Sequence, residues 1–215
     1  MNKLIIFDFD GTIIDTKQGI ISGATYALDK MGMKNESYEN LYRFIGPSLR
    51  YSFKEYYHFD DENVIEAINY YREYYFKDGI YEAKLYDGIV ALLSDLVSEG
   101  ITLAIASAKY QIAVEKQLEI FKLEKYFKVA MGNVEVDKPS TKSETIKRVI
   151  DEFPMISRDN IIMVGDSKSD AVGAFDNGVD FVSAIYDRDI SEFDGVNISK
   201  FAKDITELRS YLLEK

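Results

Sequence analysis

The sequence contains no cysteine and only one histidine, His58, among its 215 residues. The absence of cysteine excludes a disulfide framework, catalysis by a thiolate and zinc sites with cysteine ligands. It also fits a reducing compartment, so we expect the protein in the cytoplasm. A single histidine leaves little room for imidazole chemistry.

Positive charge is also scarce. The 26 lysines and arginines are outnumbered by 37 aspartates and glutamates, which gives a formal net charge of −11. No basic cluster stands out that would neutralise a nucleic-acid backbone. The sequence also lacks an apolar run long enough to span a membrane, and its N-terminus lacks a basic segment followed by a hydrophobic signal core. We therefore expect a soluble protein that binds neither nucleic acid nor membranes.

A short apolar run near the N-terminus ends in two carboxylates. Residues 3–7, Lys-Leu-Ile-Ile-Phe, are typical of a central parallel strand that is buried on both faces. Asp8, Asp10 and Gly11 follow at its carboxyl end, where open α/β sheets bind their ligands. Because side chains alternate along extended backbone, Asp8 and Asp10 are expected to face one site. The two carboxylates repel each other unless a cation lies between them or one of them keeps its proton. The alternative is a plain acidic turn in which Asp10 caps a helix.

Residues 16–83 have the pattern of a helical segment rich in tyrosine. Apolar residues recur at helical spacing over residues 20–31, 49–56 and 64–76. Gly46-Pro47 and Gly79 interrupt these patterns. We expect no strand in this segment.

From Tyr86 onward, short apolar runs alternate with amphipathic segments. Strands are expected at 101–106, 127–131, 160–164 and 181–185, and helices at 89–96, 112–121, 142–153, 171–177 and 203–213. This alternation predicts a parallel sheet with right-handed crossovers and helices on both faces. Since the helical segment is too long for one crossover, we predict a doubly wound, Rossmann-like α/β core of residues 1–15 and 84–215. Residues 16–83 would form an inserted α-helical cap domain.

Polar residues follow three of these strands. They are Asp8 with Asp10, Ser107, and Asp166 with Asp170. The carboxyl ends of parallel strands meet at one edge of the sheet, together with helix N-termini whose free N–H groups favour an anion. Carboxylates without imidazole or thiolate suit Mg²⁺. Each residue alone can be explained as a helix cap or a solvated acid, but their convergence favours a phosphate held with a divalent metal.

Three motifs resemble those of the haloacid dehalogenase superfamily. Asp8-Phe9-Asp10-Gly11-Thr12 resembles its first motif, Ala106-Ser107 its second, and the segment 165–170, Gly-Asp-Ser-Lys-Ser-Asp, its fourth. The helical insertion resembles the small cap domain of this family. Residues 45–49 and 86–89 resemble phosphoglycolate phosphatase-like members.

The resemblance implies a role for each motif. Asp8 would be the nucleophile that forms an aspartyl-phosphate, and Asp10 would be the acid and then the base. Mg²⁺ would be held by Asp8, the backbone carbonyl of Asp10, Asp166 and, in support, Asp170. The residues implied in substrate binding are Gly11, Thr12, Ser107 and Ala108, with Gly46 as a candidate in the cap. A plain turn is the alternative explanation for Gly46.

The phosphate-facing lysine is ambiguous between Lys138 and Lys142. Lys138-Pro139 resembles the commoner family pattern, whereas Lys142 shares the apolar stripe of the helix that follows and so points inward. Thr141 and Glu144 are expected to form a capping box, which places Lys142 in the first turn. A cation there is unfavourable next to the helix dipole unless it has an anionic partner. We therefore favour Lys142.

These features predict a Mg²⁺-dependent phosphatase of a small phosphorylated metabolite. A β-phosphoglucomutase-like phosphotransferase is the main alternative, but such enzymes carry a histidine in the early cap, and residues 17–20 and their surroundings have none. A dehalogenase is disfavoured because it would lack the carboxylate present as Asp10. A non-catalytic phospho-receiver module would not need the cap. The sequence does not identify the substrate, and it leaves monomer and homodimer open.

Overall fold

The computed structural model describes residues 3–134, 140–187 and 189–213. The chain divides into two compact units. The core unit joins Met1–Ile14 to Leu85–Lys215, and the helical unit, Asp15–Lys84, is inserted between these two stretches of sequence. The chain passes from one unit to the other through two short strands, β2 (Ile14–Asp15) and β3 (Lys84–Leu85), which pair in a two-stranded sheet.

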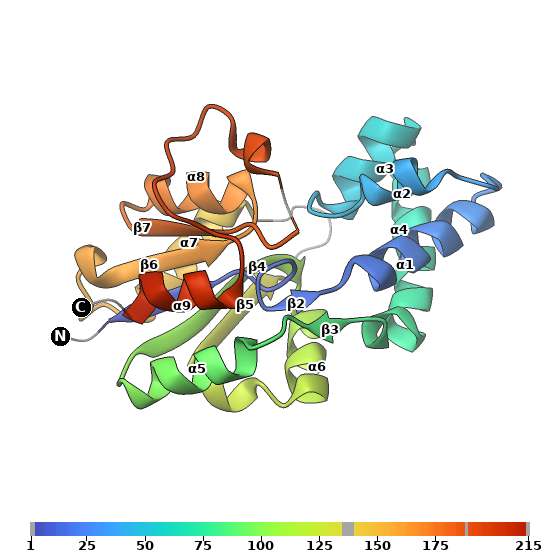
Figure 1. The fold of residues 1–215 in the computed structure, drawn as a ribbon. Helices are drawn as coiled ribbons and strands as arrows, with labels where there is room; N and C mark the ends of the chain where they lie inside the picture. The colour runs from blue at the N-terminus through green and yellow to red at the C-terminus, as the bar shows by residue number, and fades with distance from the viewer. Residues whose placement is uncertain (1–2, 135–139, 188, 214–215) are drawn as a thin grey trace. The chain divides into compact units, whose positions relative to one another are not determined.

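A six-stranded parallel sheet forms the centre of the core unit, in the order β5-β4-β1-β6-β7-β8 (Figure 1). Its strands are β1 (Leu4–Phe7), β4 (Thr102–Tyr110), β5 (Val129–Asn133), β6 (Ile161–Gly165), β7 (Asp180–Ala184) and β8 (Phe201–Ala202). In the centre, Phe7 of β1 pairs with Ile105 of β4 and Val164 of β6. The sheet is built outward from β1 in both directions, so the carboxyl end of β1 lies where such sheets bind ligands.

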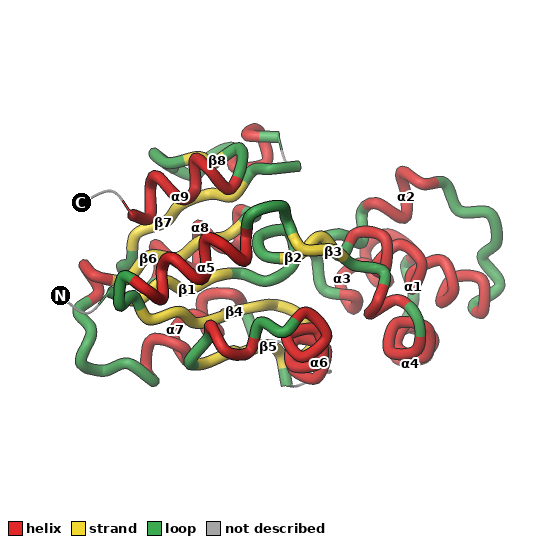
Figure 2. The backbone as a smooth tube through the Cα atoms, turned by 60° about the horizontal axis from the view of Figure 1, so that its bottom comes forward, coloured by secondary structure: helices red, strands yellow, loops and turns green. Residues whose placement is uncertain are grey.

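Helices cover both faces of this sheet (Figure 2). They are α5 (Ile89–Ser98), α6 (Gln111–Phe121), α7 (Lys142–Asp151), α8 (Lys168–Asp176) and α9 (Ile205–Leu213), with short 3₁₀ helices at Glu124–Tyr126, Arg158–Asn160 and Ile190–Phe193. Leu4 and Ile6 of β1 pack with Ile146 and Val149 of α7 in one hydrophobic cluster, which α8 completes through Ala171. The helices α5 and α9 cover the opposite face of the sheet. Because β1 is covered on both sides, all four of its residues are buried.

The helical unit contains α1 (Lys17–Lys30), α2 (Tyr38–Tyr42), α3 (Leu49–Tyr57), α4 (Asp61–Lys77) and a 3₁₀ helix at Gly79–Tyr81. Its centre is the packing of α1 against α4. Gly23 of α1 lies so close to Tyr71 of α4 that an added Cβ would come within 2.8 Å of the ring. The small residues of α1 therefore let the large aromatic side chains of α4 approach its backbone.

The predicted fold class is confirmed, since the core is a parallel α/β sheet with helices on both faces and the insertion is helical. The structure adds elements that the sequence did not suggest, namely the two-residue strands β2, β3 and β8 and the helix α2. Strands of two residues have no measurable alternation of apolar and polar side chains. In addition, β4 continues to Tyr110, past Ser107, where we expected it to stop. Among the described residues, no helix is both long and apolar enough to cross a membrane.

Candidate active site

The loop that follows β1 places Asp8 at the centre of the site. The backbone N–H of Asp8 donates to the carbonyl of Val164 over 2.8 Å, which extends the pairing of β1 with β6 by one residue. Phe9 is fully buried and anchors the loop in the core. Gly11 then turns the chain with a φ of +83°, and its N–H donates to the carbonyl of Ile14 over 2.8 Å. A buried anchor and a tight turn thus fix the carboxylates on either side of Phe9.

Gly11 lies directly against Asp166. A Cβ built on Gly11 would come within 2.0 Å of the Asp166 carboxylate oxygen Oδ2. Only glycine combines the positive φ with this close approach. The loop after β1 and the end of β6 are therefore packed together at Gly11.

Lys142 connects Asp8, in the loop after β1, with Asp170, in the first turn of α8. Its ammonium lies 2.7 Å from Oδ1 of Asp8 and 2.8 Å from Oδ1 of Asp170, and it donates to the carbonyl of Ala106 over 3.2 Å. The lysine is in the first turn of α7, behind the capping box that Thr141 and Glu144 form as expected. Its side chain is only 5% exposed. A buried cation next to the positive end of a helix is tolerated because two carboxylates hold it.

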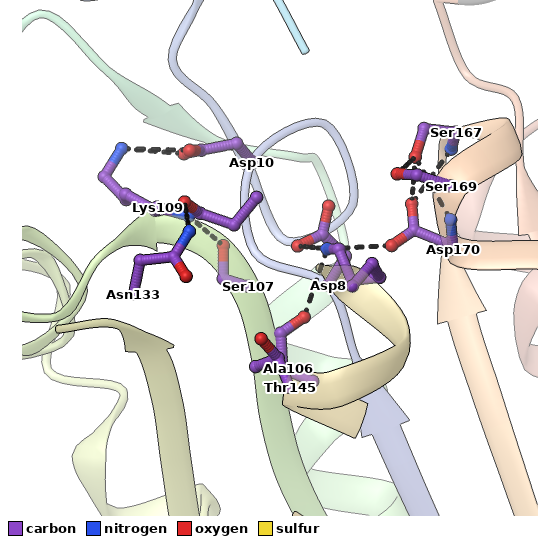
Figure 3. A network of polar contacts seen from close by, with 12 residues as sticks. Asp8, Asp10, Ala106, Ser107, Lys109, Asn133, Thr145, Ser167, Ser169 and Asp170 are labelled. Carbon is purple, nitrogen blue, oxygen red and sulfur yellow. Dashed lines mark hydrogen bonds and ion pairs between the residues drawn. The ribbon is translucent and has the colours of Figure 1, made fainter. Parts of the chain in front are cut away.

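Asp170 is held rigidly by its own helix. Ser167 caps α8 and forms a capping box with Asp170, whose Oδ2 accepts from the backbone N–H of Ser167 over 3.1 Å. Gly165 allows the close packing, because a Cβ there would lie within 2.4 Å of Asp170. The helix cap occupies one carboxylate oxygen of Asp170, while the other faces Lys142 (Figure 3).

Three buried carboxylates make the site strongly acidic. Asp8, Asp166 and Asp170 offer ligand oxygens that all lie within 4.8 Å of one another. The pKa of Asp8 is raised to about 8, chiefly by burial; the Lys142 ammonium opposes this shift, and the charges of Asp170 and Asp166 contribute to it. For Lys142, burial lowers the pKa but Asp170 and Asp8 raise it, and the net shift is upward.

The charge balance of this cluster fits a divalent cation. Burial is the main reason why the charged form of Asp8 is disfavoured, and the uncompensated charges of Asp170 and Asp166 add to it, because one ammonium cannot neutralise three carboxylates. A donor set made only of oxygens suits Mg²⁺, which binds few protein ligands and keeps several waters. The side chain of Asp10 is not part of this cluster, so a role for Asp10 as a ligand would fall to its backbone carbonyl, as the resemblance implies.

Ser107, Ala108 and Lys109 form the neighbouring edge of the site at the end of β4. The register of β4 with β5 shifts between Ala106 and Tyr110, so these three residues leave the regular ladder. The hydroxyl of Ser107 accepts from the backbone N–H of Lys109 over 3.2 Å. The carbonyl of Ala108 accepts from the side-chain amide of Asn133 over 2.7 Å.

Asp10 is paired with a lysine of its own. The ammonium of Lys109 lies 2.9 Å from Oδ1 and 3.1 Å from Oδ2 of Asp10. The side chain of Lys109 is 8% exposed and that of Asp10 is 28% exposed. Asp8 and Asp10 are thus near in sequence but are held by different cations (Figure 3).

The other predicted site residues fall into different environments. Thr12 follows Gly11 in the loop after β1, but its side chain is fully buried. Gly46 lies in the helical unit, with a φ of +108°, and therefore outside the unit that holds the carboxylates. Lys138, the alternative to Lys142, lies outside the described residues.

Sequence reasoning missed two residues of this network, Lys109 and Asn133. Lys109 comes two residues after Ser107, and its position directly after a predicted strand end was the available signal. Asn133 holds the carbonyl of Ala108 and accepts from the backbone N–H of Ser140 over 2.9 Å, just before α7. It ends β5, so a fourth strand of the sheet also ends in a polar residue.

Comparison with known proteins identifies the family. Haloacid dehalogenase-like hydrolases match the chain over residues 5–184, which include the motifs of the site up to Asp170. The chain belongs to this family. A 5'-nucleotidase from Pseudomonas aeruginosa is 34% identical over 182 residues, which cover 85% of this chain and 82% of that protein. The tyrosine-protein kinase PtkA of Mycobacterium tuberculosis is 29% identical over 214 residues, which cover 98% of this chain and 72% of the kinase.

Solved structures agree with this assignment. The structure of a predicted phosphatase from Clostridium acetobutylicum superposes with a TM-score of 0.92 and 35% identity, covering 100% of both chains. As a haloacid dehalogenase-like hydrolase with nucleotidase and phosphatase relatives, the chain is a phosphoric monoester hydrolase. The family and the class of enzyme that the motifs predicted are confirmed.

Proposed function

We propose that the protein is a Mg²⁺-dependent phosphatase that hydrolyses small phosphorylated metabolites through an aspartyl-phosphate on Asp8. The observation that carries this proposal is the placement of Asp8, which is buried, lies 2.7 Å from the Lys142 ammonium and offers an oxygen within 4.8 Å of those of Asp166 and Asp170. A carboxylate in this position has a cation as its partner and two further carboxylates with which it could hold a divalent metal. Both favour its ionised, nucleophilic form.

In the first step, an oxygen of Asp8 attacks the phosphorus in line with the bond to the leaving oxygen. The new bond joins Asp8 to phosphorus, and the bond between phosphorus and the leaving oxygen breaks. Asp10 gives its proton to that oxygen, so the product leaves as an alcohol and Asp10 is left ionised. Lys142 offsets the charge that the phosphoryl group brings beside Asp8.

In the second step, water attacks the phosphorus of the aspartyl-phosphate. Asp10 takes a proton from this water, the bond to Asp8 breaks, and inorganic phosphate is released. Asp10 regains the proton that it gave in the first step, so the cycle closes without a further acid or base. Because both steps need Asp10 near the same phosphorus, its position two residues after Asp8 and directly before the Gly11 turn suits both roles.

Asp8, the backbone carbonyl of Asp10, Asp166 and Asp170 would hold Mg²⁺, Asp170 in support. When bound, the ion neutralises charge on the phosphoryl oxygens that would otherwise repel the nucleophile. Asp166 is the ligand whose position depends on Gly11, since the two are packed in contact. Asp170 is fixed by the cap of α8 and shares Lys142 with Asp8.

Ser107 and the backbone amides that follow it would bind the other phosphoryl oxygens. The shift of register after Ala106 supports this role, because it takes the backbone of these residues out of the ladder with β5. The helical unit would act as the cap that selects the rest of the substrate. Closure would exclude water and strengthen each charge interaction with the phosphoryl group.

The test is phosphate release from a panel of small phosphate compounds in the presence of Mg²⁺. The panel contains nucleoside 5'-monophosphates, phosphoglycolate, pyrophosphate and sugar phosphates. We expect turnover of at least one of them by the wild type and its loss in Asp8→Asn. Asp151→Asn is the matched control, because Asp151 is an exposed carboxylate at the end of α7 that forms an ion pair with Lys147. Equal activity in Asp8→Asn and the wild type would refute the assignment of the nucleophile.

A further inference from the structure

Lys109 and Asp10 form a fork in which one ammonium contacts both oxygens of one carboxylate, at 2.9 and 3.1 Å. Resting on the function proposed above, we infer that Lys109 is the positioning residue of Asp10, and that it acts on proton transfer to the leaving oxygen. Lys109 does not belong to the family motifs quoted above. Its role therefore has to be argued from its own contacts.

The pair is built from two segments that the fold fixes separately. Asp10 follows the buried Phe9 and lies in an isolated bridge with Ile14. Lys109 lies near the end of β4, with its backbone N–H bound to Ser107. Contact with both carboxylate oxygens holds the Asp10 carboxyl group against the end of β4 and limits its movement away from the ammonium.

The two side chains of the pair differ in their exposure to solvent. The lysine is 8% exposed and the aspartate 28% exposed, so the lysine is enclosed while the carboxylate still reaches the solvent side. This differs from Lys142, whose two carboxylate partners are both buried. A carboxylate that is held by a buried cation and is itself accessible to solvent is suited to exchange a proton with a bound molecule.

The effect on the reaction follows from the charge. When Asp10 gives its proton to the leaving oxygen, the O–H bond to Asp10 breaks, the O–H bond of the product forms, and a negative charge remains on Asp10. Lys109 lies beside that charge, so its attraction is stronger during the transfer than before it. The contribution of Lys109 to the rate should therefore be larger for substrates whose leaving oxygen is more basic and so depends more on receiving a proton.

Lys109→Met tests this inference through the dependence of kcat/KM on the leaving group. The substrates are 4-nitrophenyl, phenyl and benzyl phosphate, whose leaving oxygens need a proton to an increasing degree. We expect a loss of about a hundredfold for benzyl phosphate and only a few-fold for 4-nitrophenyl phosphate, in line with the usual contribution of a general acid. Lys109→Arg keeps the cation and should recover most of the lost activity on benzyl phosphate.

Two controls separate positioning from other roles. Lys147→Met makes the same chemical change at an exposed ion pair and should alter no rate. In an Asp10→Asn background, Lys109→Met should have little further effect on any of the three substrates, because a residue that acts through Asp10 has nothing left to position. If the Met variant does not fold, Lys109→Gln removes the charge and retains an N–H donor.

The outcomes are distinct. A loss of equal size for the three substrates would overturn the inference, since Lys109 would then act on the phosphoryl group or on the fold. The absence of any loss, or an undiminished loss in the Asp10→Asn background, would overturn it as well. The proposed function is tested by the wild type alone. If the wild type hydrolyses the series and Asp8→Asn does not, that function stands whatever the Lys109 variants show.

Discussion

The site contains two lysine and carboxylate groupings that differ in how far they are closed to solvent. Lys142 is 5% exposed and is held by Asp8 and Asp170, whose side chains are 9% and 0% exposed. Lys109 is also enclosed, but its partner Asp10 is 28% exposed. In the mechanism that we propose, the first grouping holds the nucleophile and the metal. The second leaves one carboxylate accessible for the exchange of a proton.

The groupings also differ in net charge. The carboxylates of Asp8, Asp166 and Asp170 lie close together, and one ammonium pairs with two of them, whereas Asp10 pairs with Lys109. An excess of buried negative charge is unfavourable unless a further cation binds. The comparison therefore predicts that metal binding depends on the Lys142 grouping and that proton transfer depends on the Lys109 grouping.

The largest effect should come from removal of divalent cations. We expect EDTA to abolish hydrolysis of 4-nitrophenyl phosphate and added Mg²⁺ to restore it, because the carboxylate cluster is neutralised only with the ion bound. Asp166→Asn should raise the Mg²⁺ concentration needed for half-maximal activity, while Lys109→Met should leave it unchanged. Full activity after exhaustive chelation would contradict the need for a divalent cation. An equal shift of the required Mg²⁺ concentration in both variants would show that metal binding does not depend on the Lys142 grouping alone.

Substitution of Lys142 should have the next largest effect. Lys142→Ala should lower kcat/KM by on the order of a hundredfold or more, because it removes the cation beside the nucleophile and the phosphoryl group. It should also reduce the free energy of unfolding by about 3–5 kcal/mol, since buried carboxylates lose their partner. Steady-state kinetics and urea unfolding measure the two effects.

Lys147→Ala is the control on the same helix, where an exposed pair with Asp151 should contribute little to either quantity. Lys138→Ala should be mild. If Lys138→Ala were the more damaging substitution, the role of the phosphate-facing lysine would pass from Lys142 to Lys138.

A smaller effect is expected from Gly11→Ala. The added Cβ would displace the Asp166 carboxylate, which lies 2.0 Å from its position, and we expect Mg²⁺ activation to weaken by about 10- to 100-fold. Gly32→Ala provides the matched control, because Gly32 has nearly the same φ, +84° against +83°, with no atom within 4 Å of its added Cβ. Backbone strain is thus similar in the two variants. Equal Mg²⁺ activation curves would show that the contact of Gly11 with Asp166 is not important for metal binding.

The last effect concerns the stability of the metal-free protein and its dependence on pH. The pKa of Asp8 rises from 3.8 to about 8 on folding, chiefly through burial, so the folded state favours the protonated carboxyl group. This contribution to stability is complete below pH 3.8 and is lost as the pH rises toward 8, because only the unfolded chain ionises freely in that range. Between pH 4 and 8, the free energy of unfolding of the metal-free wild type should therefore fall by on the order of a few kcal/mol relative to that of Asp8→Asn.

Urea unfolding in EDTA at several pH values measures this difference. Added Mg²⁺ should reduce the loss, because the bound cation favours the ionised form of Asp8. If the free energies of unfolding of the wild type and Asp8→Asn changed in parallel from pH 4 to 8, the raised pKa of Asp8 would be contradicted.

Much of the core could be predicted because its pattern is regular. Buried strands that alternate with amphipathic helices indicate a parallel sheet, and the carboxyl ends of such strands bring Asp8, Ser107 and Asp166 to one edge. The placement of Lys142 followed from helix geometry, since it shares a stripe with Ile146 and Val149 and must point inward with them. The structure places its ammonium among the carboxylates, as that register requires.

Other features could not be predicted from local pattern. Lys109 is one of many lysines, and its contact with Asp10 depends on β4 continuing past Ser107, which sequence periodicity did not indicate. The strands β2, β3 and β8 are too short to show a period. Asp8 and Asp10 have different ionic partners, Lys142 and Lys109, and neither pairing could be derived from the spacing of the two aspartates in the sequence.

The most direct test of the account is to trap the phosphoryl group on Asp8. Asp10→Asn with 4-nitrophenyl phosphate is suited to this, because formation of the intermediate needs little help from an acid whereas its hydrolysis needs a base. We predict a burst of nitrophenolate close to one equivalent per site and, after an acid quench, a phosphorylated peptide that contains Asp8 by mass spectrometry. The Asp8→Asn/Asp10→Asn double variant should give neither. A phosphoryl group on another residue, or turnover with no phosphorylated protein and no burst, would contradict the central role of Asp8.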